Sequence, residues 1–265
     1  MDLSIVDYFG YNLSPKERMR LIKQAGFSSV MLLWTGEFDS DYKLFPEYAR
    51  AAGLCVENTH SAYWGYNDLW KDGPKGQKFM DEMIEAIKDC ANYGIPTMVM
   101  HPEQKKGIKV SRPPREFTVG LERLKRIVDA AERLDVNLAI ENMCRPEYLN
   151  CIFSSIDSKR LGFCFDSGHW NVFMPDIDLL NLYGDRPMAL HLHDNNGKED
   201  WHALPFEGNI NWRGVAAGLK AHSYRGAIAL EVGNKQLEYI KEPEVFLRLA
   251  AERAAQIQAL MEDRP

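Results

Sequence analysis

Histidines and carboxylates stand at or just past the ends of the short apolar runs that we expect to form β-strands. Six of the seven histidines do so, together with three carboxylates: His60, His101, His169, His191, His193, His202, Glu141, Asp166 and Glu231. Imidazole nitrogens and carboxylate oxygens are the usual ligands of divalent metal ions in proteins. The pattern therefore indicates a metal site, provided that the fold brings these strand ends together.

The elements that must position these side chains follow from the periodicity of the apolar residues. Short apolar runs alternate with longer helical patterns, and near-continuous apolar strands are typical of a buried parallel sheet. The expected strands cover residues 3–9, 28–34, 54–60, 97–101, 136–142, 161–166, 188–194 and 227–232. The expected helices include residues 75–93, 116–134 and 242–261, and Ser14-Pro15-Lys16-Glu17 predicts a capping box at the first helix.

This order of elements predicts an α/β fold, a single (β/α)8 TIM barrel formed by residues 1–265, with eight parallel strands inside and helices outside. An open doubly wound sheet is the competing fold. Its usual Gly-rich phosphate turn after the first strand is missing, because Gly10-Tyr11-Asn12 stands there. In a barrel, the C-terminal ends of the strands meet at one face, and active sites lie at that face.

Composition narrows the class of protein. The chain is 45% hydrophobic but has no run of about 18 apolar residues, so we expect no membrane span. Its net charge of −6 weakens a nucleic-acid interpretation, and the local basic cluster is Lys105, Lys106, Lys109, Arg112 and Arg115.

We expect a cytoplasmic protein, because the N-terminus lacks a signal-peptide pattern. The cysteines are expected to be buried, reduced thiols: Cys55, Cys90, Cys144, Cys151 and Cys164.

Four candidate ligands come from four consecutive strands, and we expect them to converge on the barrel axis: Glu141, Asp166, His191 and Glu231. Burying four such groups without a metal or a hydrogen-bond network would be costly, so we predict that they bind a metal. Each alone has a structural alternative, as a hydrogen-bonded histidine or a carboxylate that caps a helix. His193 lies on the same side of its strand as His191 and is expected to orient a ligand.

Other residues near the strand ends are candidates for further roles. The candidate additional metal ligands are His60, His101, His169, Asp200 and His202. Tryptophan faces could stack on a sugar ring, or could simply pack in loops, and the candidates are Trp34, Trp64, Trp170 and Trp201. His222 lies in a helical segment and is expected to be structural.

At these residues the chain resembles the xylose isomerase-like barrel superfamily, which includes sugar epimerases and endonuclease IV. The motifs that carry the resemblance are IEN with Glu141, FDSGH with Asp166 and His169, HLHD with His191 and Asp194, and LEV with Glu231. The epimerase and isomerase branches imply that Glu141, Asp166, His191 and Glu231 hold one Mn, Co or Mg ion. They also imply that Glu141 and Glu231 move the substrate proton, and that His169 contacts the sugar. Glu147 weakly matches a further substrate contact, while Gly197 replaces an arginine of the ketose epimerases.

The endonuclease IV branch uses nine ligands for three zinc ions, and this chain has a candidate for each. Its loops differ, since SAYWGYNDLW follows His60 in place of an A-P-Y run. We therefore expect a divalent-metal-dependent isomerase or epimerase of a small sugar, sugar phosphate or related polyol ketone. The alternatives are an endonuclease IV-like zinc phosphodiesterase acting on abasic DNA, and a non-catalytic barrel that binds a metal and a ligand. The expected partner is a small carbohydrate; related barrels are often oligomers, so a homo-oligomer is also compatible.

Overall fold

Eight parallel strands form one sheet that closes on itself, in a computed structural model that describes residues 1–37, 39–104 and 117–262. The basic cluster at residues 105–115 lies outside the described residues. The strands are β1 (Leu3–Val6), β2 (Ser29–Trp34), β3 (Cys55–Ser61), β4 (Thr97–Met100), β5 (Asn137–Glu141), β6 (Leu161–Asp166), β7 (Pro187–His191) and β8 (Ile228–Leu230). Their order in the sheet is β7-β6-β5-β4-β3-β2-β1-β8.

The two end strands of this order meet through a short parallel contact just beyond β7. Leu192 N donates to Ala229 O at 2.9 Å, and Glu231 N donates to Leu192 O at 3.1 Å. This bridge between Leu192 and Leu230 brings β8 beside β7. The predicted (β/α)8 barrel is therefore confirmed, and the predicted strands are all present.

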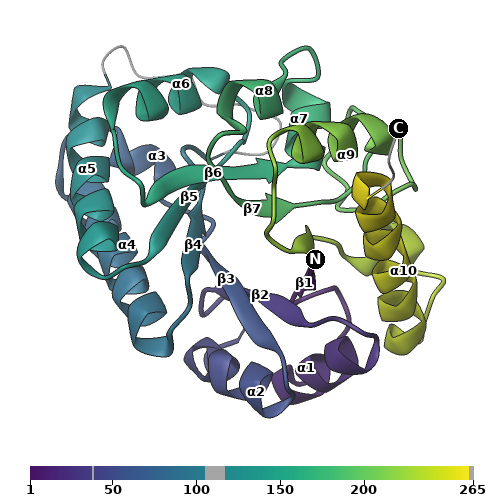
Figure 1. Cartoon of the computed structure of the whole chain (residues 1–265). Helices are drawn as coiled ribbons and strands as arrows, with labels where there is room; N and C mark the ends of the chain where they lie inside the picture. The colour runs from purple at the N-terminus through teal and green to yellow at the C-terminus, as the bar shows by residue number, and fades with distance from the viewer. Residues whose placement is uncertain (38, 105–116, 263–265) are drawn as a thin grey trace.

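Helices surround the strands, as Figure 1 shows, and α10 lies beside both α9 and α1. The α-helices are α1 (Pro15–Gln24), α2 (Phe45–Ala51), α3 (Tyr66–Leu69), α4 (Pro74–Tyr93), α5 (Thr118–Arg133), α6 (Pro146–Ser155), α7 (Ser167–Phe173), α8 (Leu179–Tyr183), α9 (Trp212–Ala221) and α10 (Pro243–Glu262). The described residues also form the 3₁₀ helices η1 (Tyr42–Leu44) and η2 (Asn234–Leu237). None of the helices in the described part of the chain is both long and apolar enough to cross a lipid bilayer.

The first helix begins where its sequence signals predict. Ser14 Oγ accepts a hydrogen bond from Glu17 N at 3.3 Å, and Pro15 occupies the first turn, where its missing N–H costs nothing. Only half of the predicted capping box forms, because the Glu17 carboxylate accepts from Arg20 Nε at 2.9 Å. The longer helix α4 ends at Gly94, whose φ of 62° is the left-handed conformation that glycine adopts most easily.

Small apolar side chains fill the barrel interior directly beneath the candidate site. Val99, Ala139, Cys164 and Ala189 form a separate buried cluster, one residue from each of β4, β5, β6 and β7. Each stands two residues before a candidate ligand: His101, Glu141, Asp166 and His191. Because side chains alternate along a strand, both sets face the interior. The sequence thus places a small-residue layer below and a polar layer above.

Strand β7 is shorter than expected, and a side chain just past the end of the neighbouring strand β6, that of Ser167, pairs with the backbone that follows it. It ends at His191 rather than at residue 194. Beyond that point the Ser167 hydroxyl forms hydrogen bonds with the backbone of His193. Ser167 Oγ donates to His193 O at 2.7 Å and accepts from His193 N at 3.0 Å. A side chain thereby replaces a strand partner, while His193 still faces the interior.

Candidate metal centre

The four residues predicted to bind a metal lie together at the C-terminal ends of β5 to β8. One ligand atom from each of Glu141, Asp166, His191 and Glu231 lies within 4.8 Å of the others. His191 Nδ1 is 2.8 Å from Glu141 Oε2 and 3.3 Å from Glu231 Oε2. The first three side chains are fully buried, and Glu231 is 6% exposed. The converging geometry that the strand ends predicted is therefore present.

Several polar atoms at this centre lack hydrogen bonds. Among the described residues, nothing forms a hydrogen bond of acceptable geometry with Glu141 Oε1 or Oε2, or with His191 Nδ1 or Nε2. Buried polar atoms without partners are costly, and proteins rarely keep them without a reason. A divalent cation bound by carboxylate oxygens and an imidazole nitrogen would satisfy them. The donor set thus fits a metal ion.

The charges of the centre are strongly coupled. Burial alone would raise the pKa of Glu141, but His191 and His101 hold that pKa well below its usual value. Burial similarly raises the pKa of Glu231, while His191 and His202 lower it, with a net downward shift. Burial lowers the pKa of His191, but neighbouring Cys164, Glu141 and Glu231 raise it well above its usual value. The raised pKa of the histidine and the lowered pKa of the two glutamates have the same cause, the attraction between imidazolium and carboxylate groups.

Asp166 uses its two oxygens for different purposes. Oδ1 accepts from His169 N at 2.6 Å, which caps helix α7, and Oδ2 lies 3.1 Å from His193 Nε2. The structural and the ligand interpretations of this strand-end carboxylate are thus compatible. His193 stands where a residue that orients Asp166 would stand.

Asn142 braces Asp166 through the backbone, a contact that sequence reasoning did not identify. Its Nδ2 donates to Asp166 O at 2.8 Å, and its Oδ1 accepts from Asp166 N at 2.8 Å. An amide side chain has the same donor and acceptor spacing as a peptide unit, so Asn142 extends the pairing of β5 with β6 beyond Glu141, the last residue of β5. Its position directly after Glu141 was the available signal.

A second group of candidate ligands lies beside the first. One ligand atom from each of His169, Asp200 and His202 lies within 4.8 Å of the others. Asp200 Oδ2 is 3.2 Å from His169 Nε2 and 3.6 Å from His202 Nε2. Burial lowers the pKa of His202, but Asp200 raises it, to about 10. Burial likewise lowers the pKa of His169, while Asp166 and Asp200 raise it well above its usual value.

His60 and His101 lie on the other side of Glu141. Their Nε2 atoms are 3.1 Å apart. Each Nε2 also lies 3.3 Å from a different oxygen of Glu141. Burial lowers the pKa of His101, against the raising effect of Glu141. A neutral imidazole is the form that binds metals. The structure thus brings together every residue that was considered as a ligand.

Two cavities open onto this centre. They hold about 290 Å³ and 230 Å³, each slightly smaller than a typical site for a drug-sized molecule. Both are lined by Tyr63, His202 and Glu231. The Tyr63 ring lies 4.8 Å from that of His60, centroid to centroid, and this tyrosine was missed because it stands in a loop with no periodic pattern.

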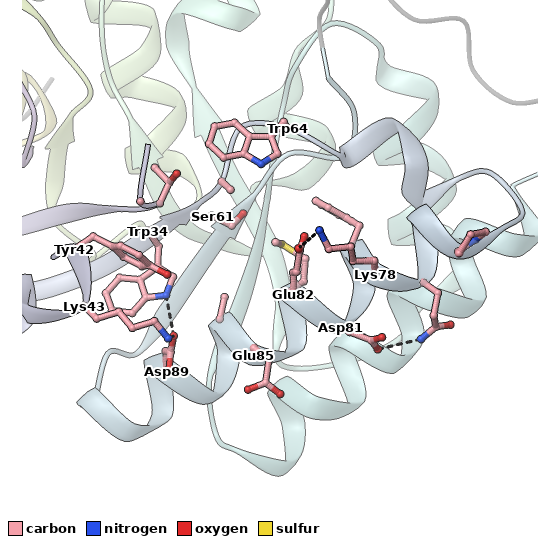
Figure 2. Close-up of a pocket in the computed structure, with 18 residues that line it drawn as sticks. Trp34, Tyr42, Lys43, Ser61, Trp64, Lys78, Asp81, Glu82, Glu85 and Asp89 are labelled. Carbon is pink, nitrogen blue, oxygen red and sulfur yellow. Dashed lines mark hydrogen bonds and ion pairs between the residues drawn. The ribbon is translucent and has the colours of Figure 1, made fainter. Parts of the chain in front are cut away.

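None of the four candidate tryptophans is among the residues that line these cavities. Figure 2 shows Trp34 and Trp64 in a groove of about 670 Å³ between α4 and the loops after β2 and β3. Trp34 is almost buried, and its Nε1 donates to Asp89 Oδ2 at 3.2 Å, whereas Trp64 is 45% exposed. Trp170 Nε1 donates to Ile177 O at 2.9 Å. The groove is larger than either cavity, but none of the candidate metal ligands lines it.

The remaining predicted residues have simpler surroundings. Glu147 lies in the first turn of α6, is exposed, and has Oε1 4.0 Å from Arg145 Nη1; it lines neither cavity. His222 caps the end of α9 and has Nδ1 3.5 Å from Asp185 Oδ1, as expected of a structural residue. No disulfide occurs among the described residues. The expectation of burial is wrong for Cys55, which is exposed because it begins β3 at the rim of the sheet, and for Cys151 on α6, which is only partly buried.

Comparisons with known proteins agree with this architecture. A family model described as "Xylose isomerase-like TIM barrel" matches residues 19–259. The uncharacterized protein y4fM of Sinorhizobium fredii is 27% identical over 259 residues, which cover 83% of this chain and 82% of that protein. D-psicose 3-epimerase with D-tagatose, from Clostridium cellulolyticum H10, has a TM-score of 0.78 at 12% identity, covering 98% of this chain and 99% of its own. The IOLI protein with a zinc atom has a TM-score of 0.76 at 15% identity, covering 99% and 98%. At these identities the solved structures show a common fold.

Proposed function

Because the chain belongs to the xylose isomerase-like TIM barrel family, we propose that it is a divalent-metal-dependent isomerase or epimerase of a small sugar, sugar phosphate or related polyol ketone. The observation that carries this proposal is the convergence of Glu141, Asp166, His191 and Glu231 within 4.8 Å, beside two small cavities. The structural similarity to an epimerase solved with D-tagatose supports the substrate class. The similarity to a zinc-bound barrel supports the metal.

The proposed chemistry is proton transfer at a carbon next to a carbonyl group. A divalent cation, when bound, supplies Lewis acidity that makes this C–H more acidic. Glu231 is ionised at neutral pH, because its pKa lies below its usual value, and it lines both cavities, so it can accept the substrate proton. Glu141 is proposed as the second proton-transfer group. It is fully buried and, unlike Glu231, lines neither cavity, so its first task is to hold the cation.

The test is a proton-exchange assay with purified protein. Chelator-treated protein is reconstituted with Mn²⁺, Co²⁺, Mg²⁺ or Zn²⁺ and incubated in D₂O with D-tagatose and a panel of ketoses and ketose phosphates. NMR then follows deuterium at the carbon next to the carbonyl, together with formation of the epimer or isomer. We expect exchange that depends on metal and disappears with chelator. A metal-loaded protein that exchanges none of these substrates would contradict the proposal.

A zinc phosphodiesterase acting on abasic DNA is the second candidate, and one observation favours it. Beyond the first four ligands, the structure gathers His169, Asp200 and His202 in one group, and places His60 and His101 on Glu141. Several zinc ions could clamp a phosphate and activate a water. About three zinc ions per chain, with cleavage of an abasic duplex that weakens steeply between about 50 and 200 mM salt, would support this candidate.

A further inference from the structure

Asp194 is a fully buried carboxylate that is not part of any candidate metal group. It lies three residues after His191, and both of its oxygens are occupied by N–H donors from the segment that follows. Oδ1 accepts from Asn195 N at 2.9 Å and from Ile210 N at 3.2 Å. Oδ2 accepts from Phe206 N at 2.9 Å and from Trp212 Nε1 at 2.7 Å. One side chain thus ties four points of the β7–α9 connection together.

The backbone of Asp194 closes the same connection. Asp194 N donates to Ala203 O at 2.8 Å, and Ala203 N donates to Asp194 O at 3.1 Å, as in an antiparallel bridge. Residues 195–202 therefore form a closed loop whose two ends meet at Asp194. The loop carries Asp200 and His202, so the placement of these two side chains depends on how the loop is closed.

His202 has a backbone conformation that needs such support. Its φ is +50°, which a residue other than glycine adopts only when its surroundings hold it there. Its Nδ1 lies 2.9 Å from Glu231 O, and Gly233 N donates to its carbonyl at 3.0 Å. Its ring stacks on that of His193 with centroids 4.1 Å apart. These contacts hold His202 beside His193 and Glu231 at the end of the closed loop.

Gly208 shows how tightly the chain passes over the Asp194 carboxylate. A Cβ at position 208 would lie 2.1 Å from Asn195 O and 2.3 Å from Asp194 Oδ1, closer than real Cβ atoms approach other atoms. The absence of a side chain at Gly208 therefore lets the segment wrap around Asp194. Gly208 and Asp194 form one clasp, which can be disturbed from either residue.

We propose that Asp194 is a positioning residue, which with Gly208 holds Asp200 and His202 against His169 and so completes a second divalent-cation site beside Glu141, Asp166, His191 and Glu231. The proposal rests on the proposed function only in that the barrel mouth binds divalent cations. Asp194 itself would touch neither cation nor substrate. Its effect is to place two ligands that belong to a loop rather than to a strand.

The test is a cobalt titration of chelator-treated protein, followed by calorimetry and by the visible absorption of bound Co²⁺. Asp194→Asn keeps the volume but presents an N–H₂ group to N–H donors, and Gly208→Ala disturbs the clasp without changing charge. The matched controls are Asp178→Asn, which alters the cap of α8 through its contact with Asn181 N, and Gly36→Ala, where a Cβ would meet the Tyr42 ring at an ordinary 3.6 Å.

We expect wild type and both controls to bind at least two Co²⁺ ions. In both clasp variants the first equivalent should bind as in wild type, which shows that the barrel is folded. The second should weaken by about 10- to 100-fold and lose its absorption band, as changes around metal ligands typically do. Unchanged binding and spectra in the variants, or a single ion in wild type, would overturn the proposal. If wild type binds one ion and exchanges ketose protons, the positioning proposal fails and the proposed function stands. If it binds two ions, the variants lose the second and no ketose exchanges, the positioning proposal stands and the proposed function fails.

Discussion

The Nδ1 atom of His191 lies 2.8 Å from Oε2 of Glu141, and both side chains are fully buried. The contact joins the ends of β7 and β5 across the barrel interior. Either a proton on His191 or a nearby divalent cation can balance the charge of Glu141. Protons and metal therefore compete for the same groups, and metal binding must release protons.

This competition predicts how pH changes the stability that a metal adds. The pKa values of His169, His191 and His202 are raised, so their stabilising contribution is complete below the usual value of 6.5. It is lost as pH rises through the folded pKa, about 10 for His202. The pKa values of Glu141 and Glu231 are lowered, so their contribution is lost only below the usual 4.5. Without metal, these five groups together should stabilise the fold most between pH 4.5 and 6.5.

Urea unfolding from about pH 6.5 to 9, in chelator and in excess Mg²⁺, checks this prediction. The quantity compared is the difference in the free energy of unfolding between the two conditions, since other titrating groups affect both alike. We expect this difference to grow with pH, because protons leave the imidazoles as the metal binds. A difference that stays constant or shrinks as pH rises would show that metal and protons do not share these ligands.

Glu231→Gln should abolish turnover while leaving the fold intact. The amide cannot accept a substrate proton, and loss of a proton-transfer group typically lowers the rate by about 10²- to 10⁴-fold. Deuterium exchange into the substrate, at saturating metal, is the measurement, with circular dichroism as the check of folding. The matched control is Glu238→Gln, an exposed glutamate seven residues on, which should behave as wild type. Exchange at the wild-type rate in Glu231→Gln would remove Glu231 from the proton path.

Asn142→Ala should weaken both stability and metal binding. The change leaves the N–H and the C=O of Asp166 without their side-chain partners, at a cost of about 1–3 kcal/mol for each buried group. Metal affinity should fall by about 10- to 100-fold, because Asp166 loses its brace. Urea unfolding and metal titration are the measurements, with Asn181→Ala at an exposed position of α8 as control. Wild-type metal affinity in Asn142→Ala would mean that Asp166 is held without this residue.

Ala139→Leu tests the layer of small side chains below the site. The extra volume must enter a buried cluster shared with Val99, Cys164 and Ala189, two residues before Glu141. Overpacking of this kind costs about 1–3 kcal/mol and moves neighbouring atoms. We expect lower stability together with weaker metal binding. The control is Ala255→Leu on the exposed face of α10, which should change neither stability nor metal affinity. Wild-type stability and metal affinity in Ala139→Leu would show that the barrel interior can accommodate the larger side chain.

The sequence was most informative where residues lie on strands. The two-residue alternation of β5, β6 and β7 puts Glu141, Asp166 and His191 on the interior face, and the parallel order brings their ends together. Strand β8 adds Glu231 one residue beyond its end. The positions of these four side chains therefore follow from the side-chain alternation of the strands and from the order of the strands in the barrel.

The sequence was less informative where loops or long-range contacts determine the position of a side chain. His202 has a positive φ within an irregular segment, and nothing local to its sequence shows that Asp194 closes that segment. Proximity to a strand end also does not say which way a side chain points. Trp34 ends β2 yet directs its ring toward Asp89 on α4, outside the barrel (Figure 2).

We propose above all that one divalent ion is bound jointly by Glu141, Asp166, His191 and Glu231. The most direct test is a crystal structure grown with Zn²⁺, with anomalous diffraction recorded on both sides of the zinc absorption edge. We predict an anomalous peak about 2.0–2.2 Å from a carboxylate oxygen of each acidic residue and from a nitrogen of His191. A fully loaded crystal whose zinc lies elsewhere, with these four side chains bound to no metal, would contradict the account.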